Sequence, residues 1–206
     1  MKLNFKIIAI ILFTGIGLLG CSTPHQSAST TCAIDIQGQI SEATLTRFSN
    51  ALNERQSAKC NEIAVTLNSG GGKMYVAMTI GELIRSQRLN TVILAGNKCA
   101  SACGLIFISG VNRALTNTAF NKSSLGLHQS SLTLKAGKIC DFSSLATQLF
   151  PITGGASKQD KYIKSMLKDD AANFYILEME KADCNNVNYL DNLEAYNRGI
   201  ATQVIR

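Results

Sequence analysis

Short apolar segments alternate with amphipathic helical segments along most of this chain, and this alternation is the feature that most constrains its fold. Residues 33–40, 62–68 and 91–96 are β-branched or nearly continuous apolar runs, which predicts strands. Residues 41–56 and 73–87 lie between them and predict helices, because the apolar residues of 41–56 fall on one helical face. Repeated strand–helix units predict an α/β domain with a mostly parallel sheet and right-handed crossovers.

The second half of the chain continues the pattern less regularly. The Ser-, Thr- and Gly-rich region 129–156 is loose, with one short helical run at 142–149. Ser157 and Asp160 have the spacing of a capping box, which predicts the start of a long helix to about residue 181. The remaining predicted elements are a helix at 101–109, strands near 113–120, 124–128 and 187–190, and a last helix from Asp191 to Gly199.

The N-terminus has the features of a secretory signal. Two lysines precede a thirteen-residue apolar run, residues 7–19, which is shorter than the about 20 residues of a membrane-spanning helix. Residues 18–21, Leu-Leu-Gly-Cys, resemble the bacterial lipoprotein cleavage box, which implies that Cys21 is lipidated. Ser22 in place of Asp then implies the outer membrane, with the protein facing the periplasm. An ordinary signal peptide with a coincidental cysteine is the alternative.

Composition and charge set further bounds. We expect a signal peptide at 1–20, the lipidated Cys21 with a flexible tether at 21–31, and one domain at 32–206 with a sizeable core. The formal net charge is +6, and loss of the two signal lysines leaves +4. Because these charges are scattered, we expect no nucleic-acid partner.

Three positions in the domain could carry chemistry. Gly70, Gly71 and Gly72 follow a strand and precede a helix, where bare N–H groups can hold an anion or an oxyanion; a tight turn is the alternative. Ser101 lies between alanines at the first turn of a helix, where it is either a nucleophile or a capping residue. His128 ends a predicted strand and is the domain's sole histidine, so it is either a base or a structural residue.

These segments together resemble the ClpP/crotonase superfamily, and within it the Clp-type serine peptidases. "TLNSGGGKMYVAMTIGELIRS" resembles the family's strand, glycine loop and helix, and "KCASACGLIFISG" its nucleophile helix. "SSLGLHQ" resembles its histidine strand, and "YLDNLEAYNRGIATQVI" its closing segment. The Cys-x-Ser-x-Cys form is similar to a periplasmic branch of the superfamily. The resemblance implies a ClpP/crotonase-like spiral of strand–strand–helix units, no cofactor, and assembly into homo-oligomers.

The resemblance also implies roles for particular residues. Ser101 would be the nucleophile and His128 its general base, since a serine hydroxyl needs an imidazole to take its proton. The oxyanion hole would be the backbone N–H groups of Gly72 and Ala102, with Gly71 close by. The substrate would be a peptide or protein.

Two departures from the family pattern bear on activity. Gly70 replaces the proline that precedes the family's glycines, and Val187 stands where the family has the acidic residue of its triad. The candidates to orient His128 are Asn186, Asn188 and Asp183, none of which aligns with that acidic position. Relatives of the same fold also use a Ser–Lys dyad, which leaves Lys122, Lys135 and Lys138 as alternative bases.

Six cysteines remain after Cys21, and an even number outside the cytosol favours disulfides over zinc, since paired CxxC motifs are lacking. We therefore expect no metal. A helical turn would bring Cys99 and Cys103 about 6 Å apart and so within disulfide range. Cys32 and Cys60 precede two consecutive strands that begin at one sheet edge, so we pair them. Cys140 and Cys184 remain as the third pair.

Three functions compete at this point. The favoured one is a lipid-anchored extracytoplasmic serine hydrolase, most simply a peptidase acting through a Ser–His acyl-enzyme. A catalytically inactive ClpP-like binding or scaffold lipoprotein is the alternative, favoured by Val187. Crotonase-like chemistry on acyl-CoA uses the same fold, but secretion argues against it because CoA thioesters are cytosolic.

Overall fold

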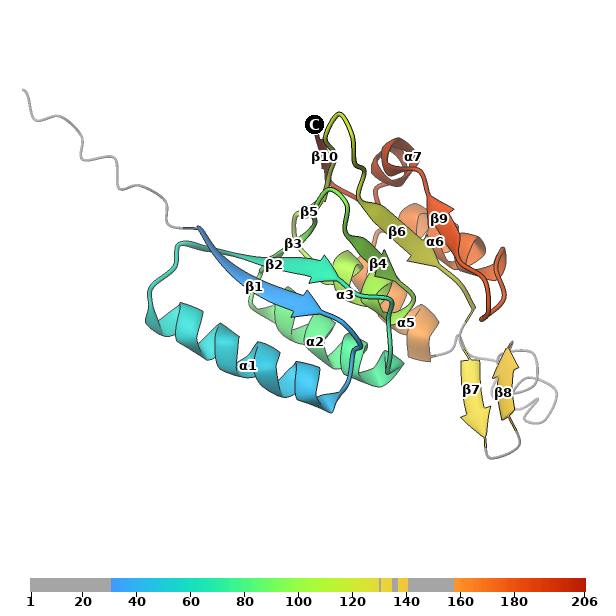
Figure 1. Cartoon of the computed structure of the whole chain (residues 1–206), viewed down its shortest axis with the longest axis horizontal. Coiled ribbons are helices and arrows are strands. Elements are labelled where there is room, and N and C mark those ends of the chain that lie inside the picture. The colour runs from blue at the N-terminus through green and yellow to red at the C-terminus, as the bar shows by residue number, and fades with distance from the viewer. Residues whose placement is uncertain (1–30, 130, 135–136, 141–157) are drawn as a thin grey trace, which may run out of the picture.

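The computed structural model describes residues 31–129, 131–134, 137–140 and 158–206, with the backbone alone for 131–134 and 137–140. Figure 1 shows the order of the elements from the N-terminus to the C-terminus. In the first half these are β1 Thr31–Gln37, α1 Glu42–Ser57, β2 Glu62–Asn68, α2 Met74–Ser86, β3 Asn90–Ile93, β4 Lys98–Ala100, α3 Ala102–Ser109, β5 Arg113–Thr116 and β6 Ser124–Leu127. In the second half they are β7 Ser131–Leu134, β8 Gly137–Cys140, α5 Lys158–Met166, α6 Asp169–Glu180, β9 Asn188–Leu190, α7 Asn192–Asn197 and β10 Gln203–Ile205.

The main sheet has five parallel strands in the order β1-β2-β3-β5-β10. Ile34 and Ile36 of β1 and Val65 and Leu67 of β2 are buried, as their alternating pattern predicts. Helices α1 and α2 lie side by side along one side of these strands (Figure 1). The mixed α/β class, the single domain and the mostly parallel main sheet predicted from the sequence are therefore confirmed.

A smaller sheet in the order β4-β6-β9 positions the candidate site. Strand β4 pairs parallel to β6, with Ala100 opposite Gly126, and β6 pairs antiparallel to β9. Because β4 and β6 run the same way, the residues that follow them, Ser101 and His128, come to neighbouring strand ends. Strand β4, which is three residues long, was not predicted from the sequence.

Helix α3 lies at the centre of the fold. All of its residues are buried, so it is surrounded by protein on every side. Its C-terminal carbonyl groups are capped by Arg85, whose guanidinium donates to the carbonyl oxygens of Ile108 and Ser109. Burial lowers the pKa of Arg85. The C-terminal end of the helix that follows Ser101 is therefore held by a group distant in the sequence.

The structure differs from the predicted elements in the C-terminal half. The single helix predicted for 157–181 is two helices, α5 and α6, because Lys168 takes an extended conformation and caps α6. Strand β10 was not predicted. The hairpin β7–β8 lies inside the region expected to be loose, while the helical run predicted at 142–149 lies outside the described residues. Strand β1 begins at Thr31, one residue before the expected start of the domain.

Candidate active site

Ser101 occupies a sharp turn between β4 and α3. Its backbone has φ 56° and ψ −127°, a region that non-glycine residues rarely adopt and that costs about 1–3 kcal/mol. Two hydrogen bonds hold it there: its N–H donates to the carbonyl oxygen of Gly126 at 3.0 Å, and its carbonyl accepts from the N–H of Gly104 at 2.8 Å. A serine on a strained strand-to-helix turn is the arrangement by which α/β hydrolases expose a nucleophile.

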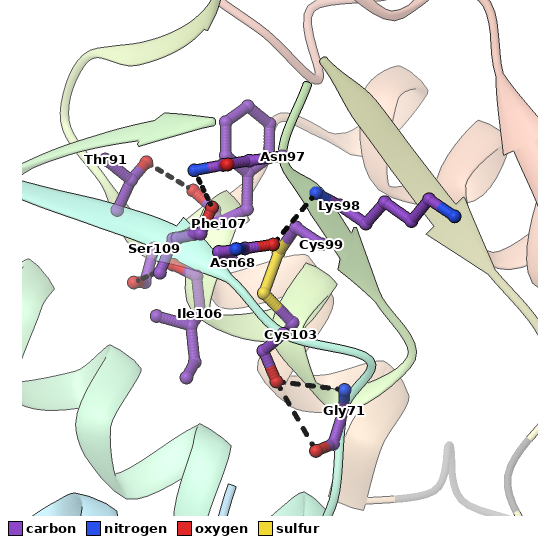
Figure 2. Close-up of a disulfide and its surroundings, with 12 residues drawn as sticks. Asn68, Gly71, Thr91, Asn97, Lys98, Cys99, Cys103, Ile106, Phe107 and Ser109 are labelled. Carbon is purple, nitrogen blue, oxygen red and sulfur yellow. Dashed lines mark hydrogen bonds between the residues drawn. A yellow bond between two sulfur atoms is a disulfide. The ribbon is translucent and has the colours of Figure 1, made fainter. Parts of the chain in front are cut away.

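A disulfide between Cys99 and Cys103 brackets this turn (Figure 2). The two Cα atoms are 5.1 Å apart and both side chains are fully buried. The bond links strand β4, before Ser101, to the first turn of helix α3, after it, as the spacing predicted. The predicted pair Cys32–Cys60 also forms, with Cα atoms 5.9 Å apart. Cys184 takes part in a disulfide, and the side chain of Cys140, its predicted partner, lies outside the described residues.

The glycine loop packs directly against Ser101. Gly71 has φ 108°, and a Cβ added to it would lie 2.7 Å from Cβ of Ser101 and 2.9 Å from the carbonyl oxygen of Ala100. Gly72 has φ 150°, and its added Cβ would lie 2.3 Å from the carbonyl oxygen of Ile40. Both positions therefore require glycine, for their conformation and for the space.

Some backbone N–H groups around Ser101 already donate a hydrogen bond within the protein, and others do not. The N–H of Gly71 donates to Oγ of Ser69 at 3.0 Å, so it is not available to a bound group. Within the described residues, the N–H groups of Gly72 and Ala102 donate to no protein acceptor. Of the three predicted oxyanion-hole residues, Gly72 and Ala102 can therefore donate to a bound group, whereas Gly71 acts through its lack of a side chain. Ser69 was missed by the sequence reasoning.

His128 follows β6 and is half-buried. Its Nδ1 lies 2.6 Å from the carbonyl oxygen of Gln129. A carbonyl oxygen can only accept, so in the neutral imidazole Nδ1 is the N–H donor and the lone pair is on Nε2. Gln129 is held in turn by α6 and the residues after it: its N–H donates to the carbonyl of Ala182 at 3.0 Å, and its Nε2 to that of Glu180 at 3.2 Å.

The side chains considered as orienting groups have other partners. Asp183 Oδ1 accepts from the N–H groups of Asn185 and Asn186, and the side-chain amide of Asn188 donates to Glu178. Among the described residues, none of the three candidates shares a hydrogen bond with His128. At the family's acidic position, Val187 instead packs on the strand, its Cγ1 lying 2.5 Å from where a Cβ of Gly126 would be.

The alternative lysine bases are constrained as well. Lys98 pairs with Ser124 and Ala100 with Gly126. Continued in the same register, Lys122 is opposite residue 96, which is five residues before Ser101. At about 3.3 Å per residue this is a separation of roughly 16 Å along the strands, which argues against Lys122. The side chains of Lys135 and Lys138 lie outside the described residues.

These groups share a cavity of about 340 Å³. Ser101, Ala102, Gly72 and His128 all line it, so the fold brings together four of the residues chosen from the sequence. Among the described residues, Ser101 and His128 share no hydrogen bond; contacts between a nucleophile and its base often tighten only when substrate binds. The other lining residues are Gln39, Lys73, Met74, Leu105, Leu127, Gln159, Tyr175 and Met179.

A charged cluster lies at the rim of the cavity. Nζ of Lys73 is 2.7 Å from both carboxylate oxygens of Glu42, and the Tyr75 hydroxyl donates to the same carboxylate. The hydrogen bond from Lys73 is the main cause that lowers the pKa of Glu42 to about 2, and the same bond raises the pKa of Lys73. Lys73 is thus a paired cation at physiological pH, a poor candidate for a proton-accepting base.

Together, the fold and this site define an α/β protein with a serine on a strained turn, a histidine in the same cavity and two open N–H donors. The family model for the Clp protease family, described as "Clp protease", matches residues 21–206. The chain belongs to the Clp protease family. A comparison with curated proteins found no significant match to its sequence.

Solved structures support the same fold. One similar structure is the 1510-N membrane-bound stomatin-specific protease in a serine-to-alanine mutant, with 18% identity, a TM-score of 0.64, and 86% of this chain and 80% of that one covered. A lysine-to-alanine mutant of that protease, in complex with a substrate peptide, has 20% identity and a TM-score of 0.65 over 87% and 76%. A ClpP1 mutant from Listeria monocytogenes has 18% identity and a TM-score of 0.59 over 84% and 91%.

In the part of the chain that the structure describes, no helix combines the length and the apolar character that crossing a bilayer requires.

Proposed function

We propose that this protein is a serine peptidase that acts through a Ser101–His128 dyad and an acyl-enzyme intermediate. The observation that carries the proposal is the state of His128. In the neutral imidazole its Nδ1 donates to the carbonyl oxygen of Gln129, which leaves Nε2 as the proton acceptor, and His128 and Ser101 line the same cavity. That is the tautomer a general base must have.

The carbonyl of Gln129 takes over part of the role of the missing carboxylate. In a triad, the acidic residue sets the tautomer and orientation of the histidine and also stabilises the imidazolium that forms. A backbone carbonyl can set the tautomer and the orientation of the histidine, but as a neutral group it stabilises the imidazolium less than a carboxylate does. We therefore expect a working but slower enzyme than a full triad would give.

The proposed reaction follows from the positions of the open groups. Nε2 of His128 takes the Ser101 hydroxyl proton as Oγ attacks the substrate carbonyl carbon. The developing oxyanion accepts hydrogen bonds from the N–H groups of Gly72 and Ala102, the latter at the positive end of α3. The imidazolium then protonates the leaving amine, and the amide bond breaks to leave an ester on Ser101. Water, deprotonated by the same imidazole, hydrolyses the ester.

We further propose that the enzyme acts in the bacterial cell envelope. Lipidation of Cys21 after removal of residues 1–20 would anchor it to a membrane, with 22–31 as tether and the domain in the periplasm. The disulfides Cys32–Cys60 and Cys99–Cys103 support this, because such bonds persist in oxidising compartments. The substrate would be a peptide or protein, and assembly of several copies would follow the habit of the family.

The test is labelling of the full-length protein with a fluorophosphonate probe, which reacts with activated serines. We expect wild-type protein to be labelled, Ser101→Ala and His128→Ala to be unlabelled, and Ser86→Ala, a change at an exposed serine on α2, to label at the wild-type rate. A folded wild-type protein that is not labelled would contradict the proposal. That result would favour the binding or scaffold lipoprotein, with Val187 in place of the acidic residue as the reason.

A further inference from the structure

The site cavity has several apolar walls, and neutral polar side chains lie among them: Tyr175 of α6 and Gln159 of α5, whose Nε2 donates to Sδ of Met179 at 3.6 Å. The apolar walls include Leu105 of α3, Leu127 of β6 and Met179 of α6. A substrate side chain next to the scissile bond would enter this space.

The hydroxyl of Tyr175 has no protein partner. Tyr175 is only 1% exposed, yet its hydroxyl makes no hydrogen bond with any residue that the structure describes. In that part of the chain, every completely buried side-chain nitrogen or oxygen has a partner. The Tyr175 hydroxyl must therefore be reached from the cavity that the residue lines. Burial raises the pKa of Tyr175, so the phenol stays protonated and can both donate and accept.

Gly104 makes the space for this hydroxyl. A Cβ on Gly104 would lie 2.4 Å from the Tyr175 oxygen and 3.4 Å from Cδ2 of Leu127. Gly104 is one helical turn after Ser101, about 4.5 Å along the axis of α3. Gly104 and Ser101 are therefore separated along α3 by about the length of an unbranched side chain.

We propose that Tyr175 determines specificity by selecting a neutral side chain with a hydrogen-bonding tip, such as glutamine, immediately before the scissile bond. This inference rests on the proposed function. A leucine tip would cover the hydroxyl and leave it unpaired, which disfavours binding. A charged tip would lose its hydration among Leu105, Leu127 and Met179, and Lys73, which also lines the cavity, is already paired with Glu42. The glutamine amide can form a hydrogen bond with the hydroxyl, and it carries no charge that would have to be neutralised.

The experiment uses full-length protein and three fluorogenic peptides that differ only in that residue: glutamine, leucine or glutamate. We expect the glutamine peptide to have a kcat/KM at least about tenfold higher than the leucine peptide, and the glutamate peptide to be the poorest. In Tyr175→Phe the glutamine-to-leucine ratio should fall to near one. Tyr162→Phe is the matched control, because Tyr162 is also a buried tyrosine but its hydroxyl donates to the carbonyl of Leu105. It should keep the wild-type ratio.

Two results would overturn this inference: a wild-type preference for leucine, or an unchanged ratio in Tyr175→Phe. Binding of the same peptides to Ser101→Ala, measured by calorimetry, separates it from the proposed function. Absence of turnover and of probe labelling would refute the peptidase alone. A tenfold binding preference for glutamine in Ser101→Ala, lost in the double variant with Tyr175→Phe, would still support the role of Tyr175, and equal binding of both peptides would refute it.

Discussion

The replacement of Gly71 by alanine is the sharpest test of how the glycine loop supports the site. The new Cβ would lie 2.7 Å from Cβ of Ser101 and 2.9 Å from the carbonyl oxygen of Ala100, at a φ of 108° that alanine rarely adopts. Backbone strain of about 1–3 kcal/mol and overpacking of about 1–3 kcal/mol should together lower the free energy of unfolding by about 2–6 kcal/mol. At about 2–4 °C per kcal/mol for a domain of this size, that corresponds to a fall in Tm of roughly 4–24 °C.

The neighbouring glycine is a matched control. A Cβ on Gly70 would have no atom within 4 Å, and Gly70 does not have a positive φ. Gly70→Ala should therefore change the free energy of unfolding by no more than about 0.5 kcal/mol. The free energies would be measured by urea unfolding, and the rate of fluorophosphonate labelling would be measured on the folded variants.

The labelling rate tests the site rather than the stability. Relief of the clash must displace either the loop or Ser101, and a shift of about 1 Å at a reacting group can reduce its rate roughly 100-fold. We expect that loss in Gly71→Ala and none in Gly70→Ala. If Gly71→Ala unfolds at the wild-type urea concentration and labels at the wild-type rate, the close approach of this loop to Ser101 has been misjudged.

Two further predictions concern the surroundings of the site. Replacement of Cys99 and Cys103 together by serine should lower the free energy of unfolding by about 2 kcal/mol, because the bond closes a short loop in the unfolded chain. It should also slow labelling of Ser101 in protein that is still folded; unchanged labelling would show that the turn holds without the bond. The carboxyl group of Glu42 should titrate by NMR with a pKa of about 2, below its ordinary 4.5, and Lys73→Met should move it upward. Since this pKa is lowered in the folded state, the ion pair stabilises above about pH 4.5 and its contribution is lost as the pH falls towards 2; both groups are exposed, so the effect should be small and reduced by salt.

Much of the fold could be predicted because its local signals are strong. The strand at 62–68 has the predicted bounds, and α1 and α2 begin and end within two residues of the predicted ones. Apolar periodicity and the flanking polar residues determine such elements before any tertiary contact forms. The cap predicted at Asp191 is also present, with Oδ1 accepting from the N–H groups of Leu193 and Glu194.

The errors share a physical cause. Strands β4 and β10 have three residues each, too few for an alternating pattern, and they exist because longer neighbours offer them hydrogen bonds. The break between α5 and α6 at Lys168 interrupts a segment whose local sequence favours one continuous helix. In both cases tertiary pairing or packing decides between conformations of similar local energy.

The α/β class, the pairing of Cys99 with Cys103, and the choice of Ser101, His128 and the glycine loop as the candidate site could all be predicted from the sequence, because each has a local signal in the residues around it. The contact between His128 and the carbonyl of Gln129 became evident only in the folded chain, since Gln129 is held by Glu180, 51 positions away. The unpaired hydroxyl of Tyr175 was equally hidden, because whether a buried polar group has a partner depends on what packs around it and not on its sequence neighbours.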